Sequence, residues 1–372
     1  ERETLYRKGA MESIENLWTY LEGCGGSMPY WRSPGPNYRF IIHSHRNRAA
    51  AGAGHCGISD VDRAGIGHEF CHNMPVGGWD GMYYETWANA GQHITIPGEF
   101  QMFPGNFCYP WRNVNRLQYQ SSFWAFALGD NPNWGHGAPI SIGSLAGAAE
   151  PTPYHSVARL GEKRGLWKNG IKGWGDWWGE YAARMVTVDT IEKNIVGRYG
   201  MPTLSAVYPV YGHANRYRIS AAESPRFCGF NIIRLQPEEG AGEITVDFQG
   251  IHDPALHSDW RACIVAVDAE GRPRYSSLWN KGEMTFELKP SDMNLWLSVS
   301  ASPSAFPVLS KDSPHHKFGP WFLMGVHAPR YPWEITLAGC QPGAPHRRQG
   351  DVDSFDHLSG ITDYGNKFLD IP

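Results

Sequence analysis

The feature that most constrains the fold is a change in hydrophobic pattern near residue 204. Before it, apolar residues recur at the three- and four-residue intervals of helices, whereas beyond it they gather into short alternating runs. Six such runs cover residues 230–235, 243–248, 263–267, 284–288, 295–299 and 333–337. Turn-forming pairs such as Glu270-Gly271 and Lys281-Gly282 separate them. This pattern predicts an antiparallel β-sandwich.

The length of the chain predicts two domains. Its 372 residues exceed the roughly 100 to 200 residues of most single domains. We expect a catalytic domain over residues 1–203, the β-sandwich over 204–342 and a polar tail over 343–372. A predicted helix over 174–190 closes the first domain, and the fold class is α+β.

Composition and charge narrow the possible partners. The net charge is −4 and there is no block of like charges, which does not favour nucleic acid or an anionic membrane surface. No apolar run approaches the roughly 20 residues of a membrane span. The 16 tryptophans are typical of clefts that bind peptides or carbohydrates.

Seven cysteines are spread along the chain with no CxxC pair, which argues against a cysteine-built metal site. We expect two or three disulfides, with Cys71 as the candidate for an unpaired thiol, and hence a secreted protein. The polar start at Glu1 is interpreted as the result of signal-peptide removal. Scattered buried thiols are the alternative.

A helix is predicted over residues 60–74. Ser59 or Asp60 can cap its N-terminus, and Pro75 ends it. Apolar residues recur on one face of this helix at four-residue intervals, namely Ile66, Phe70 and Met74. Because His68 and His72 lie on the other side, we expect both to face a cleft.

The sequence His68-Glu69-Phe70-Cys71-His72 is an HExxH motif. Two histidines four residues apart on a helix can both reach one zinc ion at about 2.0–2.1 Å. Zinc lowers the pKa of a bound water toward about 7, and Glu69 can take its proton. The motif therefore predicts a zinc hydrolase, the alternative being a chance match with hydrogen-bonded histidines.

After the motif, Tyr84-Glu85-Thr86-Trp87-Ala88-Asn89 resembles the ExxxD helix of gluzincin metallopeptidases, the thermolysin-like class. This resemblance, over about residues 38–93, implies a zincin-like catalytic domain with Zn²⁺ as cofactor and Glu85 as third ligand. It gives Asn89 the position of the family's aspartate, which orients a ligand histidine. The chain departs from the family in this asparagine and in a spacing of only 12 residues between His72 and Glu85. The alternative third ligands are His93, Asp80 and His55.

Zincins also carry a strand ahead of the motif helix whose edge binds the substrate. Residues 55–58 stand where that strand is expected, so a peptide could add to it by main-chain pairing. Tyr154 with His155, or Tyr83 with Tyr84, could donate to the oxyanion of the transition state.

These observations predict a zinc-dependent hydrolase that cleaves peptide bonds of proteins or glycoproteins with Glu69 as general base. One alternative is a metal-assisted glycoside hydrolase or polysaccharide lyase, in which two of His43, His45 and His55 act with a tyrosine on a polysaccharide substrate. The other is a non-catalytic glycan-binding protein in which HExxH is accidental.

Overall fold

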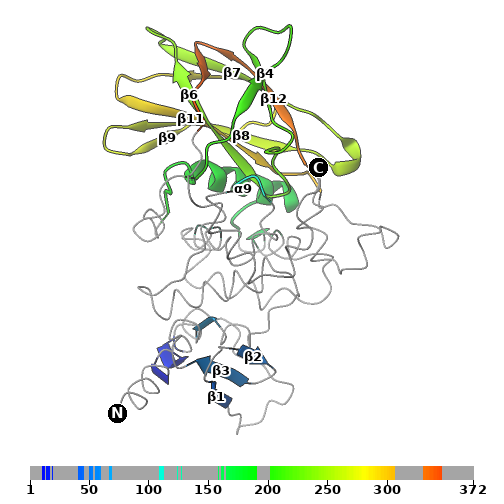
Figure 1. Ribbon diagram of the computed structural model, residues 1–372, viewed down its shortest axis with the longest axis vertical. Coiled ribbons are helices and arrows are strands. Elements are labelled where there is room, and N and C mark those ends of the chain that lie inside the picture. Colours follow the sequence, from blue (N-terminus) through cyan, green and yellow to red (C-terminus); the bar gives the residue numbers. More distant parts are fainter. Residues whose placement is uncertain are drawn as a thin grey trace. The chain divides into compact units, whose positions relative to one another are not determined.

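The computed structural model describes residues 165–190, 202–305 and 330–345 continuously, with residues 109–112 and the backbone of three short strands between 41 and 59 (Figure 1). It also describes the single positions Met11, Glu12, Ile14, Glu15, Asn16, Thr19, Gly67, His68, Trp124, Ala127, Ala158, Gly161 and Glu162.

The chain divides into two compact units. The first comprises residues 1–103 and 118–166, and the second comprises 104–117 and 167–372. Helix α9, Ile171–Arg184, belongs to the second unit, where it packs on strands β8 and β11. It overlaps the helix predicted over residues 174–190 at the end of the first domain; the amphipathic pattern of that helix shows that one face is covered but not which element covers it.

Ten strands of the second unit form two five-stranded sheets. The first sheet has the order β10-β7-β12-β5-β4. Its strands are β4 Val207–Pro209, β5 Arg216–Ile219, β7 Glu243–Gly250, β10 Gly282–Glu287 and β12 Trp333–Ala338. The second sheet has the order β13-β6-β11-β8-β9. Its strands are β6 Phe230–Pro237, β8 Trp260–Asp268, β9 Pro273–Tyr275, β11 Asp292–Ala301 and β13 Cys340–Pro342.

All neighbouring strands in these two sheets are antiparallel. Each of the six predicted runs coincides with a strand, so the all-antiparallel prediction for this part of the chain is confirmed. The aromatic rings of Phe248 from the first sheet and Trp260 from the second lie 6.4 Å apart, in an arrangement consistent with a β-sandwich.

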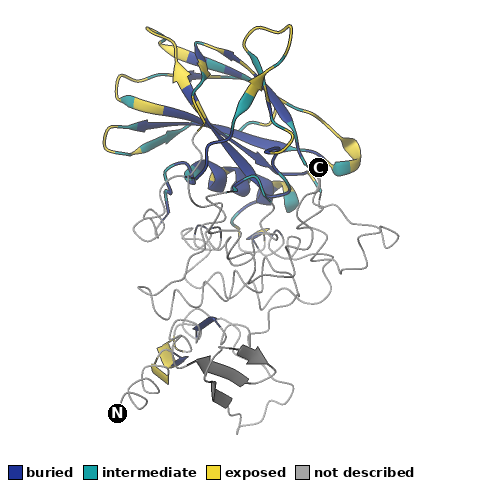
Figure 2. Ribbon diagram, in the orientation of Figure 1, coloured by how far each residue is buried: buried dark blue, intermediate teal, exposed yellow. Residues whose placement is uncertain are grey.

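The two sheets differ in what covers their outer faces. Strand β7 alternates between buried and more exposed positions, as expected when only one face is covered. Strand β8 is buried at every residue from Trp260 to Val267, because the first sheet covers one face and α9 covers the other (Figure 2).

Two glycines allow α9 to approach the second sheet closely. A Cβ atom on Gly179 would lie 2.5 Å from Cβ of Arg261 on β8, and one on Gly175 would lie 3.2 Å from Cβ of Ser302. Asp176, on the same side of the helix, accepts a hydrogen bond of 2.5 Å from Nε of the buried Arg261. The ring of Tyr181 lies 6.1 Å from that of Phe230 in an edge contact. The contact thus combines an ion pair between a buried arginine and a partly exposed aspartate with aromatic packing.

The first unit contains a small sheet of the order β1-β3-β2, formed by Ile41–His45, Ala50–Gly52 and His55–Ser59. Strand β3 runs parallel to β1 and antiparallel to β2. The predicted strand at 55–58 lies within β3.

No helix in the described part of the chain is long and apolar enough to cross a membrane. Three of the seven cysteines, Cys228, Cys263 and Cys340, are buried free thiols. They leave four cysteines, enough for at most two disulfides. Cys71, the predicted unpaired thiol, lies outside the described residues.

Candidate functional site

His68, the first histidine of the HExxH motif, is helical together with Gly67, and its side chain is buried, with an exposed fraction of 8%. The helical state agrees with the helix predicted over residues 60–74. The other predicted site residues lie outside the described part of the chain: Glu69, His72, Glu85, Asn89, Tyr154 and His155.

Within the described residues, no group of three or more His, Cys, Asp or Glu side chains gathers in a way that could hold a metal ion. Of the alternative third ligands, Asp80 and His93 lie outside these residues, and His55 is described only as backbone of β3. Zinc binding by His68, His72 and Glu85 therefore stays a prediction.

Strand β3 does not have the edge position expected for a substrate-binding strand. Residues 55–59 pair with β1 on one side, and residues 55–57 pair with β2 on the other. A peptide cannot pair with backbone groups that already form a ladder, so addition of a substrate along His55–Gly57 is excluded. The sequence could not show this, because the short Ala50–Gly52 strand has no apolar alternation that marks it as a partner.

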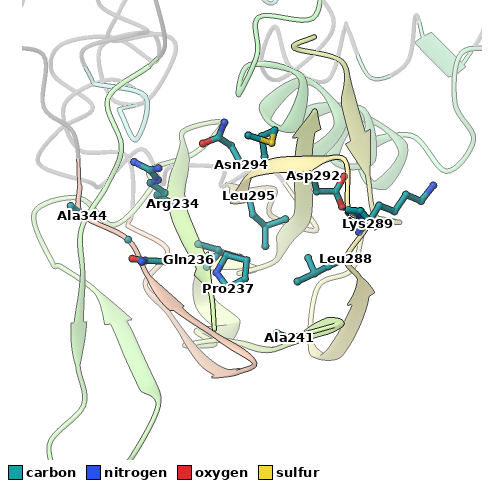
Figure 3. Close-up of a pocket in the computed structure, with 14 residues that line it drawn as sticks. Arg234, Gln236, Pro237, Ala241, Leu288, Lys289, Asp292, Asn294, Leu295 and Ala344 are labelled. Carbon is teal, nitrogen blue, oxygen red and sulfur yellow. Dashed lines mark hydrogen bonds between the residues drawn. The ribbon is translucent and has the colours of Figure 1, made fainter. Parts of the chain in front are cut away.

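The second unit contains a pocket that sequence reasoning did not find. It has a volume of about 530 Å³ and lies at one end of the two sheets, where the β6–β7 and β10–β11 connections meet (Figure 3). We call it the strand-end pocket. Fourteen residues line it: Arg234, Leu235, Gln236, Pro237, Ala241, Leu288, Lys289, Pro290, Asp292, Met293, Asn294, Leu295, Gly343 and Ala344.

The floor of the strand-end pocket is apolar and its rim is polar. Leu295 and Leu288 point toward the centre (Figure 3). The side chains of Arg234 and Gln236 leave the opposite face of β6, since Arg234 pairs with Trp296 and Leu235 pairs with Leu295. The backbone N–H of Leu288 donates a 2.9 Å hydrogen bond to the carbonyl oxygen of Gly242, which ties the two connections together. The strand-end pocket is an open depression with both apolar and polar lining, and most small-molecule sites are more enclosed and more apolar.

The charged side chains that line the strand-end pocket differ in whether they have an ion-pair partner. Asp292 accepts a hydrogen bond from Arg274 and another, of 2.8 Å, from the backbone N–H of Lys289. Its negative charge is therefore compensated by Arg274. The side chains of Arg234 and Lys289 form no ion pair with any described residue.

The lining residues come from strand ends and connections spread between residues 234 and 344. Only the Gly240 and Pro290 turns marked these segments in the sequence, and turn signals do not show which ends meet. The strand-end pocket thus depends on the sheet order, which the sequence leaves open.

Comparison with known proteins gives a match to a family model over part of the chain and no activity. Residues 171–344 match the model of a family of unknown function, DUF6055. No curated protein matches the chain. The crystal structure of the Yersinia pseudotuberculosis-derived mitogen is similar to 39% of this chain and 99% of its own, with 10% identity and a TM-score of 0.20.

Proposed function

We propose that the protein is a zinc-dependent hydrolase that cleaves peptide bonds, with His68, His72 and Glu85 as metal ligands. The observation that carries the proposal is the helical state of His68 at the start of HExxH, because helical residues four apart lie on one face. Two histidines and one glutamate form a donor set that catalytic zinc takes in hydrolases, and it leaves a fourth position open.

The residues of the motif have separate roles in this proposal. When bound, zinc supplies Lewis-acid polarisation and lowers the pKa of water at the site. The Glu69 carboxylate accepts the proton of the attacking water and delivers it to the nitrogen of the leaving amine. Asn89 accepts a hydrogen bond from a ligand histidine and holds its ring orientation. Tyr154 or His155 donates to the developing oxyanion.

Secretion and a protein or glycoprotein substrate are parts of the same proposal. The three free cysteines do not oppose secretion, since four others remain for pairing. The zincin-like catalytic domain is likewise proposed from the motif and from its position after a three-stranded sheet.

The test combines elemental analysis with turnover of casein by the full chain, purified without chelator. We expect one zinc per chain, and in Glu69→Gln retained zinc with a loss of activity of about 10²- to 10⁴-fold. Glu283→Gln, an exposed strand carboxylate, is the matched control and stays active. A metal-free protein, or full activity in Glu69→Gln, would overturn the proposal. Unsaturated products from a polysaccharide, with casein left intact, would indicate that the protein is a polysaccharide lyase instead.

A further inference from the structure

We propose that the open edge of strand β10, residues 283–287, binds an extended basic segment of a partner protein, which adds to the first sheet as a further antiparallel strand. This is a binding function of the second unit, and it does not depend on the zinc proposal. Three observations carry the inference: the length of this edge, the backbone groups that it leaves unpaired and the acidic side chains beside it.

Strand β10 is the longest of the four edge strands of the two five-stranded sheets. The other three, β4, β9 and β13, have three residues each and contain Pro209, Pro273 and Pro342 respectively. Short edge strands and prolines prevent a further strand from pairing. Strand β10 has six residues and no proline. It is therefore the edge of these two sheets at which an added strand can form a ladder.

The hydrogen-bond pattern shows which backbone groups of β10 face outward. In an antiparallel pair, alternate residues exchange hydrogen bonds with the residue directly opposite. The N–H of Leu288 donates to the carbonyl oxygen of Gly242, so the even-numbered residues of β10 bond to β7. The odd-numbered residues, Glu283, Thr285 and Glu287, point their N–H and C=O groups away from β7. Within the described residues, the backbone groups of Glu283 and Thr285 have no hydrogen-bond partner on that side.

The outer face of the sheet beside this edge carries acids in directly opposed pairs. Glu283 lies opposite Asp247 of β7, and Glu287 lies opposite Glu243. Like charges in such positions destabilise a sheet, and none of these four carboxylates forms an ion pair with a described residue. Acids on an edge strand can protect against aggregation, but Asp247 and Glu243 lie on an inner strand and add nothing to that protection. Basic side chains on an added strand would offset the repulsion.

The inner face of the sheet at this edge is apolar. Phe286 is buried and Met284 is half-buried, and the guanidinium of Arg274 lies over the Phe286 ring at 4.1 Å. Nη2 of Arg274 also donates a 2.9 Å hydrogen bond to the carbonyl oxygen of Glu287, where the open edge ends. Because side chains alternate along a strand, a segment with basic residues toward Glu283 has its other side chains toward Met284. The edge therefore fits a segment that alternates basic and apolar residues.

Charge favours such a segment over a second copy of this chain. Strand β10 has two carboxylates, Glu283 and Glu287, and no cation, so a second β10 would add acids to this surface. The nearest cations along the chain, Lys281 and Lys289, lie outside the residues that pair with β7. A strand with lysine or arginine at alternate positions instead places a cation opposite each carboxylate of β10.

The first test is fluorescence anisotropy of a short labelled peptide of alternating lysine and valine, titrated with the full chain. We expect this peptide to bind and a peptide of alternating glutamate and valine not to bind, because only lysines oppose the acids of β10 and β7. Added salt should weaken binding, since these charges are exposed. No binding of the lysine peptide, or equal binding of the two peptides, would overturn the proposal.

Methylated peptides separate backbone pairing from charge. In antiparallel pairing the lysines lie opposite Glu283, Thr285 and Glu287, so their N–H groups point at β10, whereas the N–H groups of the valines point outward. N-methylation of the lysines should weaken binding at least about tenfold. N-methylation of the valines adds the same number of methyl groups and should leave the affinity unchanged. Equal affinity of the two methylated peptides would refute strand pairing.

Variants then locate the binding. Thr285→Pro removes an outward N–H and should weaken binding at least about tenfold, whereas Thr285→Ala should bind as the parent does. Glu243→Gln/Glu287→Gln should weaken it about three- to tenfold. Glu238→Gln/Glu239→Gln, which removes two exposed carboxylates of the β6–β7 turn, is the matched control and should not weaken it. Circular dichroism checks that each variant is folded.

Unchanged affinity in Glu243→Gln/Glu287→Gln, or in folded Thr285→Pro, would refute the assignment to β10. A dimer of the parent chain in sedimentation that Thr285→Pro dissociates would assign the edge to a second copy instead.

Discussion

Nε1 of Trp333 donates a 3.0 Å hydrogen bond to Oδ1 of Asn231, and both side chains are wholly buried. Trp333 lies in the first sheet and Asn231 in the second, so the bond joins the two sheets inside their shared core. Nδ2 of Asn231 completes the arrangement by donating to Oγ of Ser205 and to the carbonyl oxygen of Glu223, each at 2.9 Å.

The Asn231 network should matter more for stability than its single bonds suggest. Asn231→Leu removes the acceptor of Trp333 and the donor for two oxygens, so buried polar groups lose their partners. We expect a loss of about 3 kcal/mol in the free energy of unfolding, measured by urea denaturation. The exposed Asn294→Leu is the control, with a change within about 0.5 kcal/mol. A similar change in both would show that the network is not stabilising.

At position 179 of α9, glycine should stabilise the folded protein more than alanine would. Replacement of glycine by alanine usually favours an exposed helix by about 1 kcal/mol. In Gly179→Ala, however, the new methyl group would lie 2.5 Å from Cβ of Arg261, so α9 has to move off β8. We expect destabilisation of about 1–3 kcal/mol by thermal or urea unfolding. Gly175→Ala, whose nearest neighbour is at 3.2 Å, should cost less, and the reverse order would contradict this packing.

Acid should weaken the first sheet through Glu334. Burial opposes ionisation of its carboxyl group, but hydrogen bonds and charge from Arg218 and Arg216 outweigh burial, so the pKa lies below its ordinary value of 4.5. The stabilisation is complete above the unfolded pKa and is lost as pH falls through the folded one. Unfolding free energies between pH 7 and 3 should therefore fall less steeply in Glu334→Gln than in the parent. Identical slopes of unfolding free energy against pH in Glu334→Gln and in the parent would show that Glu334 does not cause the loss of stability in acid.

The three buried thiols should be unreactive in the folded protein. Burial is the main cause that raises the pKa of Cys263 to about 11 and that of Cys340 to about 12, and it also raises the pKa of Cys228. Since the thiolate is the reactive form, iodoacetamide at pH 7.5 should label none of them before denaturation. Peptide mass mapping, with and without urea and without reductant, tests this. Labelling of Cys263 in the native state would show that its strand opens.

The third zinc ligand can be identified independently of the two histidines of the motif. We expect Glu85→Ala to lower zinc content as strongly as His72→Ala, whereas Asp80→Ala and His93→Ala retain the metal. Zinc per chain, measured after dialysis, is the readout. Retention in Glu85→Ala together with loss in His93→Ala would transfer the role to His93.

The strands of the second unit could be predicted because their pattern is local. Residues 243–248 alternate between a covered and an open face, and the turn at Lys281-Gly282 marks where β10 begins. Short strands such as β4, β9 and β13, of three residues each, carry too few residues for alternation to show. Helix α9 was expected from its spacing, but the sheet that it covers is a long-range property.

The candidate sites, too, could be predicted only where they depend on a local sequence pattern. HExxH is a local pattern, and His68 is helical as expected. The central position of β3 depends on pairing with both β1 and β2, and the strand-end pocket depends on chain ends far apart in sequence. Such features follow from the order of strands in a sheet, which hydrophobic periodicity does not contain.

The covering of the second sheet by α9 bears on where this part of the chain can be cut. The residues that match the DUF6055 model begin at Ile171, the first residue of α9, and end two residues beyond β13, so the match includes the helix as well as both sheets. A shorter chain that starts at residue 204 would leave Phe230, Ile232 and Val265 open to water. The exposed apolar surface would bind the same surface on other copies, so we expect the shorter chain to self-associate.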